Sequence, residues 1–257
     1  MTAGLRALLE GLIDYAGLFP PAALEMDAAL RNYAAYRRGP HAWALGRFVV
    51  PVARVDEVDP AFPCSVIGMA TRVVDTCEIK VESAGDVPAP LPGVIAYYEL
   101  PIADNPAPLA GTAGRAKVRT GGLTPDAFPP SGELARFVAR CARAKVPFKA
   151  TAGLHHPVRG VHRCTYEADT PSARMHGFVN LFLAAALLWH GGSESDAVTT
   201  LEEESADRFH FDDGGVAWHA HRLTVEQVRV ARTQFAISFG SCSFEEPLQD
   251  LQQLGWL

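Results

Sequence analysis

The chain has 257 residues, a formal net charge of −6 and a hydrophobic content of 48%, which is enough apolar sequence for one large folded domain. The acidic balance and the lack of a stripe rich in lysine and arginine argue against a nucleic-acid-binding protein. Five dispersed cysteines without a Cys-x-x-Cys pair do not indicate a disulfide scaffold or a zinc knuckle, and no apolar run reaches the ~18 residues of a membrane span.

Residues 1–45 are predicted to form a helical segment that packs on a single domain covering residues 1–257. Residues 5–15 have apolar side chains at helical spacing, and a glycine followed by two prolines ends that pattern. A second helix is predicted over residues 26–38. No basic segment followed by an uninterrupted apolar run begins the chain, so we predict a cytoplasmic protein without a membrane partner.

Short continuous apolar runs in the rest of the chain predict eight strands of the kind buried on both faces. Their expected positions are residues 46–52, 64–69, 77–82, 93–99, 115–119, 146–151, 208–211 and 235–239. Helices between the later strands are predicted over residues 132–145, 174–189, 194–204 and 224–233. Strands that alternate with helices favour parallel βα units, so the sequence predicts an α/β fold, a (β/α)8 TIM-like barrel with an N-terminal helical extension.

The first half of this barrel is expected to be irregular, because residues 70–76 are too few for a normal helix and residues 83–92 are rich in proline. The last predicted helix has the clearest start, since Thr224 and Gln227 have the spacing of a capping box. An open doubly wound sheet is the alternative fold. No Gly-x-Gly-x-x-Gly fingerprint or P-loop follows a predicted strand, which weakens its nucleotide-binding version.

Charged side chains gather at or just beyond the predicted strand ends. They are Lys80, Glu82, Glu99, Lys117, Arg119, Lys149 and the charged residues of the 241–246 segment. A solvated strand end explains each of them alone. In a (β/α)8 barrel, however, the carboxyl-terminal strand ends meet at one mouth, where catalytic groups lie. Their shared placement therefore predicts one site.

Two of these strand ends carry a lysine followed by a glycine-bearing turn. Residues 117–122 read Lys-Val-Arg-Thr-Gly-Gly, and residues 148–157 read Phe-Lys-Ala-Thr-Ala-Gly-Leu-His-His-Pro. A lysine attacks a carbonyl carbon as a free amine when burial or a nearby cation lowers its pKa from about 10.4. Two lysines on adjacent strands can supply that perturbation, so the motifs predict a lysine-based active site.

The two segments resemble the lysine strands of the deoxyribose-phosphate aldolase type of Schiff-base barrel, which read Lys-Thr-Ser-Thr-Gly-Phe and Lys-Ala-Ser-Gly-Gly-Ile-Arg. The residues that match in register are Lys117, Thr120, Gly121, Lys149, Ala150 and Gly153. By this resemblance Lys117 forms the imine, Lys149 lowers its pKa, and Glu82 or Glu99 relays protons. The resemblance is limited to these short segments. Arg119 stands where the family has serine, and far more chain follows Lys149 than in the family.

Other polar residues are assigned to substrate binding and proton transfer. Arg119 has a planar guanidinium that suits a carboxylate or phosphate, and the turn after the last predicted strand can present backbone N–H groups to an anion. His155 or His156 would move protons near neutral pH. The predicted anion- or substrate-binding residues are Arg119, Thr151, Asn180, Gly240, Ser241 and Ser243.

Three of these assignments have alternatives. Asn180 and His176 lie one turn apart on one helix face, where they either contact substrate or satisfy loop backbone. Ser243 either belongs to an anion site or caps the following helix. Cys242 is a candidate nucleophile for which the sequence indicates no base, so a structural role is favoured.

The sequence thus predicts an enzyme that needs no cofactor and acts on a small anionic carbonyl or sugar-like compound, by aldol-type C–C lyase or isomerase chemistry. The first alternative is a metal-dependent hydrolase or isomerase, in which His219 and His221 on one strand share a divalent metal with His155. A surface hairpin is the plain interpretation of that histidine pair. The second alternative is a non-catalytic anion-binding barrel. Whether the protein forms a homo-oligomer is left open.

Overall fold

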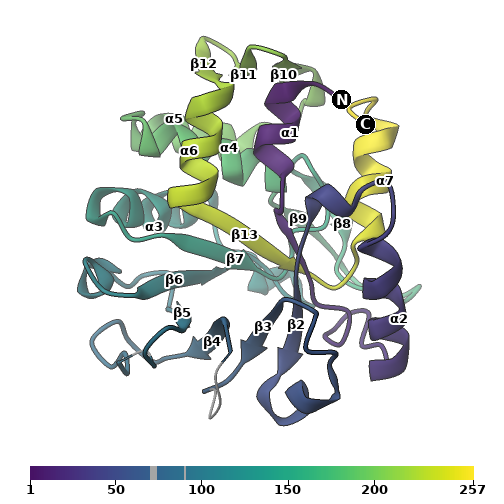
Figure 1. The fold of residues 1–257 in the computed structure, drawn as a ribbon. Coiled ribbons are helices and arrows are strands. Elements are labelled where there is room, and N and C mark those ends of the chain that lie inside the picture. Colours follow the sequence, from purple (N-terminus) through teal and green to yellow (C-terminus); the bar gives the residue numbers. More distant parts are fainter. Residues whose placement is uncertain (70–73, 90) are drawn as a thin grey trace.

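Eight parallel strands form a closed barrel in the computed structural model, which describes residues 1–69, 74–89 and 91–257 (Figure 1). The predicted (β/α)8 TIM-like fold is therefore confirmed. Around the barrel the strands are β1 (Ile13–Tyr15), β13 (Ala236–Ser241), β7 (Phe148–Thr151), β6 (Gly114–Arg119), β5 (Ile95–Glu99), β4 (Thr76–Lys80), β3 (Cys64–Ile67) and β2 (Leu45–Pro51).

The barrel includes one strand that we did not predict. The helix predicted over residues 5–15 ends early, because α1 (Ala3–Leu9) stops before Gly11, whose φ of 58° is left-handed. Strand β1 follows at once and pairs with β13 on one side and β2 on the other. Its three residues are too short a run to be separated from the preceding apolar helix by periodicity.

One predicted barrel strand belongs to a different sheet. The strand expected at residues 208–211 is β10 (Phe209–Asp212), which pairs antiparallel with β11 (Gly215–Trp218). Strand β12 (His221–Thr224) completes this three-stranded sheet. A second small sheet contains β8 (Gly160–Arg163) and β9 (Ser172–Met175), so the helix predicted from residue 174 begins only after β9.

The other predicted helices are present as α2 (Met26–Tyr36), α3 (Ser131–Ala144), α4 (Phe178–Trp189), α5 (Glu194–Glu202) and α6 (Val225–Gln234). Helix α7 (Glu245–Gln253) follows β13, where the sequence predicts no helix bounds. The predicted capping box is present, since Thr224 accepts from the Gln227 N–H and the Gln227 side chain accepts from the Thr224 N–H. Among the described residues, no helix has the length and apolarity that crossing a bilayer requires.

Helices cover the barrel unevenly (Figure 1). Helices α1 and α3 to α6 gather on the side of β6, β7 and β13. In the described part of the chain between β2 and β6, the connections hold only the 3-10 helices η2 (Val52–Glu57) and η3 (Ala107–Leu109). The irregular first half is thus confirmed, although residues 70–73 and 90 of the two connections lie outside the described residues.

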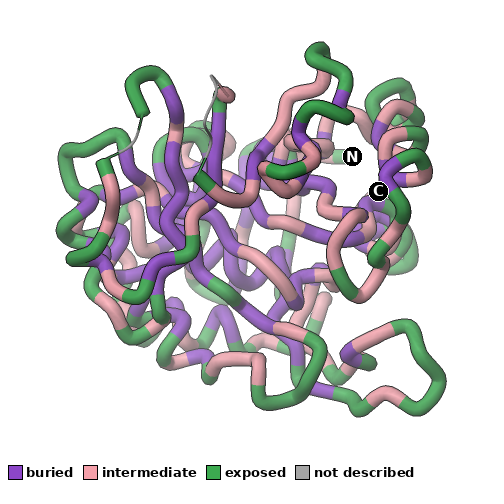
Figure 2. Tube along the Cα trace, turned by 90° about the horizontal axis from the view of Figure 1, so that it is seen from below, coloured by how far each residue is buried: buried purple, intermediate pink, exposed green. Residues whose placement is uncertain are grey.

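The apolar core lies between the strands and the helices, whereas the inside of the barrel is polar. On β6 the buried Ala116 and Val118 belong to the apolar core, and they alternate with Arg115, Lys117 and Arg119. Successive side chains of a strand point to opposite faces, so the charged set points inward. Figure 2 shows that buried segments gather at the centre of the molecule and that exposed segments lie mostly toward its edge. The barrel interior therefore contains the charged side chains that a catalytic site would need.

Candidate active site

A cavity of about 730 Å³ opens at the carboxyl-terminal ends of the barrel strands. The side chains that line it include Glu78, Glu99, Lys117, Arg119 and Thr151 from the barrel strands. His155, His156, Cys242 and Glu246 line it as well, together with Gly240. This volume suits a small-molecule ligand, and the position is the one where enzymes with this fold place their catalytic groups.

Alternating charges run through the barrel in one continuous chain of ion pairs, which we call the charge chain. Its members, in order, are Asp14, Lys149, Glu78, Lys117, Glu99 and Arg119. Lys149 Nζ lies 2.6 Å from both Asp14 Oδ2 and Glu78 Oε1. Lys117 Nζ lies 2.7 Å from Glu78 Oε2 and 2.8 Å from Glu99 Oε2. Each lysine is therefore held between two carboxylates.

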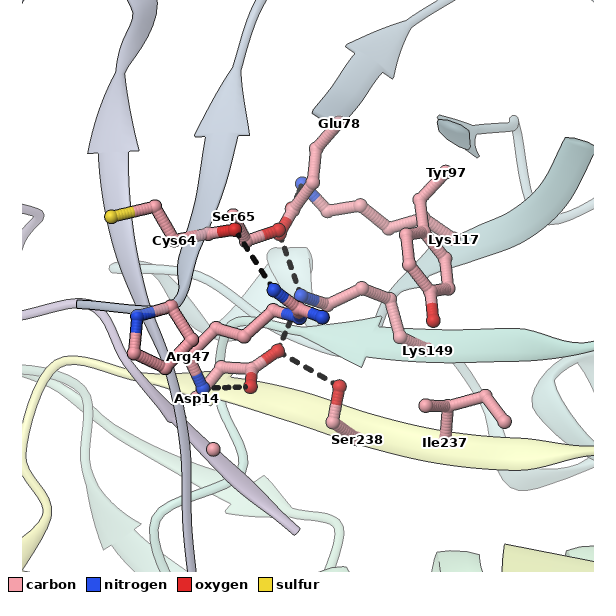
Figure 3. Close-up of polar contacts among 12 residues, drawn as sticks. Asp14, Arg47, Cys64, Ser65, Glu78, Tyr97, Lys117, Lys149, Ile237 and Ser238 are labelled. Atoms are coloured by element: carbon pink, nitrogen blue, oxygen red, sulfur yellow. Dashed lines mark hydrogen bonds and ion pairs between the residues drawn. The ribbon is translucent and has the colours of Figure 1, made fainter. Parts of the chain in front are cut away.

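The strand register explains why these side chains meet. Glu99 pairs in register with Lys117 across β5 and β6, and Lys117 pairs with Lys149 across β6 and β7. The two lysines therefore stand on adjacent strands, as their motifs predict. Glu78 reaches them from β4, and Asp14 from β1. In Figure 3 the Lys149 side chain extends between Glu78 and Asp14.

Hydrogen bonds from neutral groups fix the buried carboxylates of the charge chain. The Ser65 hydroxyl donates to Glu78 Oε1 over 2.6 Å, and the Ser238 hydroxyl donates to Asp14 Oδ2 over 2.8 Å (Figure 3). The other oxygen of Asp14 accepts from the backbone N–H of Arg47. These bonds satisfy carboxylate lone pairs that the lysines leave unused. Glu78 is thereby held in the orientation that contacts both lysines, and Asp14 in the orientation that contacts Lys149.

The charge chain favours the ionised form of Glu78 and the protonated form of Lys149. Burial alone would lower the pKa of Lys149, but Asp14 and Glu78 outweigh it and raise that pKa above the ordinary value. Burial alone would raise the pKa of Glu78, but Lys149 and Lys117 outweigh it and lower that pKa well below its usual range. The Glu78 carboxylate therefore lies between the Nζ atoms of Lys149 and Lys117.

Only part of the charge chain is accessible from the mouth. Lys117 and Arg119 line the 730 Å³ cavity, and the Arg119 side chain is 54% exposed although its Nε and Nη2 both contact Glu99 Oε1. Lys149 lines a separate cavity of about 290 Å³, which also includes residues from amino-terminal strand ends such as Leu45 and Thr76. A substrate in the mouth would therefore meet Lys117 and Arg119 rather than Lys149.

The glycine and threonine residues of the two lysine motifs have structural roles. Thr120 donates its hydroxyl hydrogen bond to the carbonyl of Ala152, over 2.6 Å. A Cβ atom on Gly121 would lie 2.9 Å from the Gly153 Cα, and Gly153 itself has a φ of 72°. The turns after β6 and β7 thus touch backbone to backbone. Packing of these turns explains the matched residues Thr120, Gly121 and Gly153 without shared ancestry.

The histidines after β7 pair with acidic residues of α7. His155 Nδ1 lies 2.8 Å from Glu246 Oε2, and His156 Nδ1 lies 2.6 Å from Asp250 Oδ2. The other ring nitrogen of His155, Nε2, lies 4.0 Å from the sulfur of Cys242. Cys242 therefore has the neighbouring base that the sequence did not indicate. The two loops follow β7 and β13, which are neighbours only because a long segment between them folds outside the barrel.

Several predicted site residues do not line the mouth in the described structure. Asn180 is fully buried, where its amide donates to the carbonyls of Thr200 and Glu203, and Glu82 is exposed beyond β4. Ser243 accepts from the Glu246 N–H and so caps α7, and Ser241 Oγ accepts from the Ser243 N–H. Of the predicted anion-binding residues Gly240, Ser241 and Ser243, only Gly240 is among the described residues that line the cavity.

The histidine pair of the metal hypothesis lies outside the barrel. His219 occupies the turn before β12 with a φ of 49°, so the expectation that His219 and His221 share one strand is wrong. His219 pairs with Glu203 and His221 with Asp196. Within the described ranges, no group of three or more His, Cys, Asp or Glu side chains is arranged to hold a metal ion.

Comparisons of the chain with models of known protein families, with curated proteins and with solved structures give no match. The barrel therefore establishes the fold and a place for a site, as is typical of enzymes. The resemblance to deoxyribose-phosphate aldolases rests on the two lysine motifs alone.

Proposed function

We propose that the protein is an enzyme that acts at the barrel mouth on a small anionic carbonyl compound, with Lys117 as an imine-forming nucleophile. The observation that supports this most is the position of Lys117. It lines the mouth cavity, and its Nζ lies within 2.8 Å of the carboxylates of both Glu78 and Glu99. An amine for carbonyl chemistry needs both an accessible nitrogen and a proton acceptor.

The two carboxylates differ in a way that separates their roles. Glu78 contacts both lysines and is 3% exposed, whereas Glu99 is 9% exposed and contacts Lys117 and Arg119. Glu99 would accept a proton from Lys117, which leaves the free amine that attacks the carbonyl carbon. The same proton would then assist loss of water from the carbinolamine. The Glu78 carboxylate would offset the positive charge of a protonated imine at Lys117, and Lys149 would hold Glu78 in place.

Arg119 would bind the anionic group of the substrate. Its guanidinium stands at the mouth end of the charge chain, and about half of the side chain is exposed. A carboxylate or phosphate on Arg119 would place a carbonyl group two or three carbon atoms away near Lys117, which precedes Arg119 on the same inward face of β6. C–C bond cleavage, C–C bond formation or isomerisation through the imine are the reactions that such an arrangement serves.

Borohydride trapping tests this proposal. The protein would be incubated with 2-oxo acids and phosphorylated aldehydes, reduced, digested and mapped by mass spectrometry. We expect a reduced adduct on Lys117, and more of it with anionic carbonyl compounds than with neutral ones of the same size. The Lys117→Arg variant keeps the positive charge between Glu78 and Glu99 but cannot form an imine, so it should lose the adduct.

Lys80 provides the matched control for that experiment, because it lines the same cavity and is exposed. The Lys80→Arg variant should form the Lys117 adduct as the unmodified protein does. An adduct that persists in Lys117→Arg, or that maps to Lys80, would contradict the assignment of Lys117.

A further inference from the structure

A cysteine, a histidine and a glutamate stand in series in the lining of the mouth cavity. Cys242 follows β13 and His155 follows β7, and these two strands are paired in the barrel. The Cys242 sulfur lies 4.0 Å from His155 Nε2, while His155 Nδ1 lies 2.8 Å from Glu246 Oε2. A nucleophile next to a base that a third group orients is the arrangement of a catalytic triad.

Tyr166 contacts both Glu246 and Cys242 in this group. Its hydroxyl donates to Glu246 Oε2 over 3.1 Å and lies 3.5 Å from the Cys242 sulfur. Glu246 is thereby fixed by both His155 and Tyr166, and the imidazole ring is fixed by Glu246. Cys242 is 6% exposed, yet it lines the cavity together with His155, Tyr166 and Glu246. The sulfur is thus protected from bulk water but adjacent to the space where a ligand would lie.

The pKa shifts of Cys242 and His155 favour a thiolate next to an imidazolium. Burial alone would raise the pKa of Cys242, but the hydrogen bond and the charge interaction with His155 outweigh it, and the pKa is lowered. Burial alone would lower the pKa of His155, but Cys242 and Glu246 outweigh it and raise that pKa to about 10. Burial instead raises the pKa of Cys77, Cys141 and Cys164. Cys242 differs from these three because it has a cationic neighbour.

We infer that Cys242 is the nucleophile of an acyl-transfer site, with His155 as its acid–base partner and Glu246 as the residue that orients the imidazole. The exposed part of Arg119 lines the same cavity, so the substrate class is small acyl compounds that carry an anionic group. This activity uses none of the imine chemistry proposed for Lys117.

The reaction proceeds in two balanced steps. The Cys242 thiolate attacks the carbonyl carbon of an ester or amide and forms a C–S bond, while the bond to the leaving oxygen or nitrogen breaks. The leaving group takes the proton from His155 Nε2. Water then attacks the thioester and gives a proton to His155, and the thiolate leaves as the carboxylic acid is released. The net reaction consumes one acyl compound and one water molecule.

Thiol alkylation at controlled pH tests the first part of this inference. Iodoacetamide would be added between pH 5 and pH 9, and each cysteine peptide would be quantified by mass spectrometry. At pH 6 we expect Cys242 to react about 10-fold faster or more than in the His155→Ala variant, because a thiolate is the reactive form. His190→Ala removes an exposed histidine that only contacts the Gln227 carbonyl and should react as the unmodified protein does. Equal rates in the two histidine variants would overturn the proposed pair.

Acyl transfer is tested with mono-4-nitrophenyl succinate and, for comparison, neutral 4-nitrophenyl acetate. We expect a burst of one nitrophenol per chain with the succinate ester, an acyl group on the Cys242 peptide, and a slower burst with the acetate. Cys242→Ala and Cys242→Ser should each remove the burst. Two variants are used so that the result does not depend on one of them folding correctly. A burst that survives both, an acyl group on another residue, or no acylation at all would overturn the nucleophile assignment. A faster reaction with acetate would overturn the substrate class.

The peptide that carries the label separates this inference from the proposed function. An acyl group would be found on the peptide that contains Cys242, and a reduced imine on the one that contains Lys117. Each experiment can therefore succeed when the other fails.

Discussion

Glu78 binds the ammonium groups of two buried lysines, and this residue determines whether the polar interior of the barrel is stable. Its two oxygens contact Lys149 and Lys117 over 2.6 Å and 2.7 Å. A charge removed from water is costly unless it is paired and its remaining hydrogen bonds are satisfied. The serine and backbone donors around Glu78 and Asp14 meet that second condition.

The Glu78→Gln variant should therefore unfold far more easily than the unmodified protein. It leaves two buried ammonium groups with one carboxylate fewer, a change that typically costs about 3–5 kcal/mol of unfolding free energy. Urea denaturation followed by circular dichroism would measure it. Glu82→Gln, an exposed change just beyond the same strand, should stay within about 0.5 kcal/mol of the unmodified protein. Similar losses in both variants would show that the buried charge is not what matters.

Single residues of the site were predictable only in part from the sequence. Lys117, Lys149 and Glu99 stood out because a charge at the end of an apolar strand is unusual. Glu78 was missed because it lies inside a strand rather than at its end, and Asp14 because its segment has the apolar spacing of a helix. The base for Cys242 was out of reach, since His155 is near it only through the pairing of β7 with β13.

The turns after β6 and β7 position the site as one unit. Gly121 and Gly153 touch through their backbones, and the Thr120 hydroxyl ties the first turn to the Ala152 carbonyl of the second. Lys117 and Lys149 precede these contacts on the same two strands, β6 and β7. A change that separates the turns would therefore disturb the register of the lysines as well as the loop that carries His155.

The Gly153→Ala variant tests this contact between turns. The new methyl group would lie 2.8 Å from the Gly121 Cα, and the φ of 72° is unfavourable for alanine. We expect a loss of about 1–3 kcal/mol of unfolding free energy, measured by urea denaturation. Gly132→Ala in α3 is the control, because its added methyl group meets nothing within 4 Å, and it should stabilise the helix by about 0.5–1 kcal/mol. A neutral Gly153→Ala would refute the close contact.

Long elements were predictable because their patterns are local, whereas barrel membership was not. The helices α2, α3 and α6 follow from patterns within their own segments, and α6 also has a capping box that its sequence indicates. Both β10 and the barrel strands are short apolar runs, and their sequences do not state whether a partner strand is parallel or antiparallel. The predicted number of barrel strands, eight, was therefore right, although β10 was predicted in place of β1.

Over the whole molecule, the barrel interior is polar, unlike a barrel whose interior is packed with apolar side chains. The inside holds the charge chain, and the apolar core lies beneath the outer helices. Part of the folding stability consequently depends on the ionisation of buried carboxylates. That dependence is a property of global unfolding rather than of any local contact.

Acid should therefore destabilise the protein as a whole. Burial would raise the pKa of Glu99, but Lys117 and Arg119 outweigh it and hold that pKa below its ordinary value of 4.5; the pKa of Glu78 is lowered as well. The unfolded state thus binds more protons than the folded state in this range. The stabilisation is present above about pH 4.5 and is lost as the pH falls through the folded-state pKa values.

Urea denaturation at a series of pH values from 7 to 3 would measure this loss. The Glu99→Gln variant lacks one of the titrating groups, so its unfolding free energy should fall less steeply with acid than that of the unmodified protein. Glu82→Gln should follow the unmodified protein. Parallel curves for all three proteins would mean that the charge chain does not set the acid limit.

Strand β13 closes the barrel between β1 and β7, and it is synthesised after the other strands of the barrel. Until it emerges, β1 and β7 each have an open edge with unpaired backbone groups, and Asp14 lacks the Ser238 hydroxyl. Exposed edges of this kind invite pairing with other chains. We therefore expect the nascent protein to depend most on protection by chaperones before β13 has been synthesised.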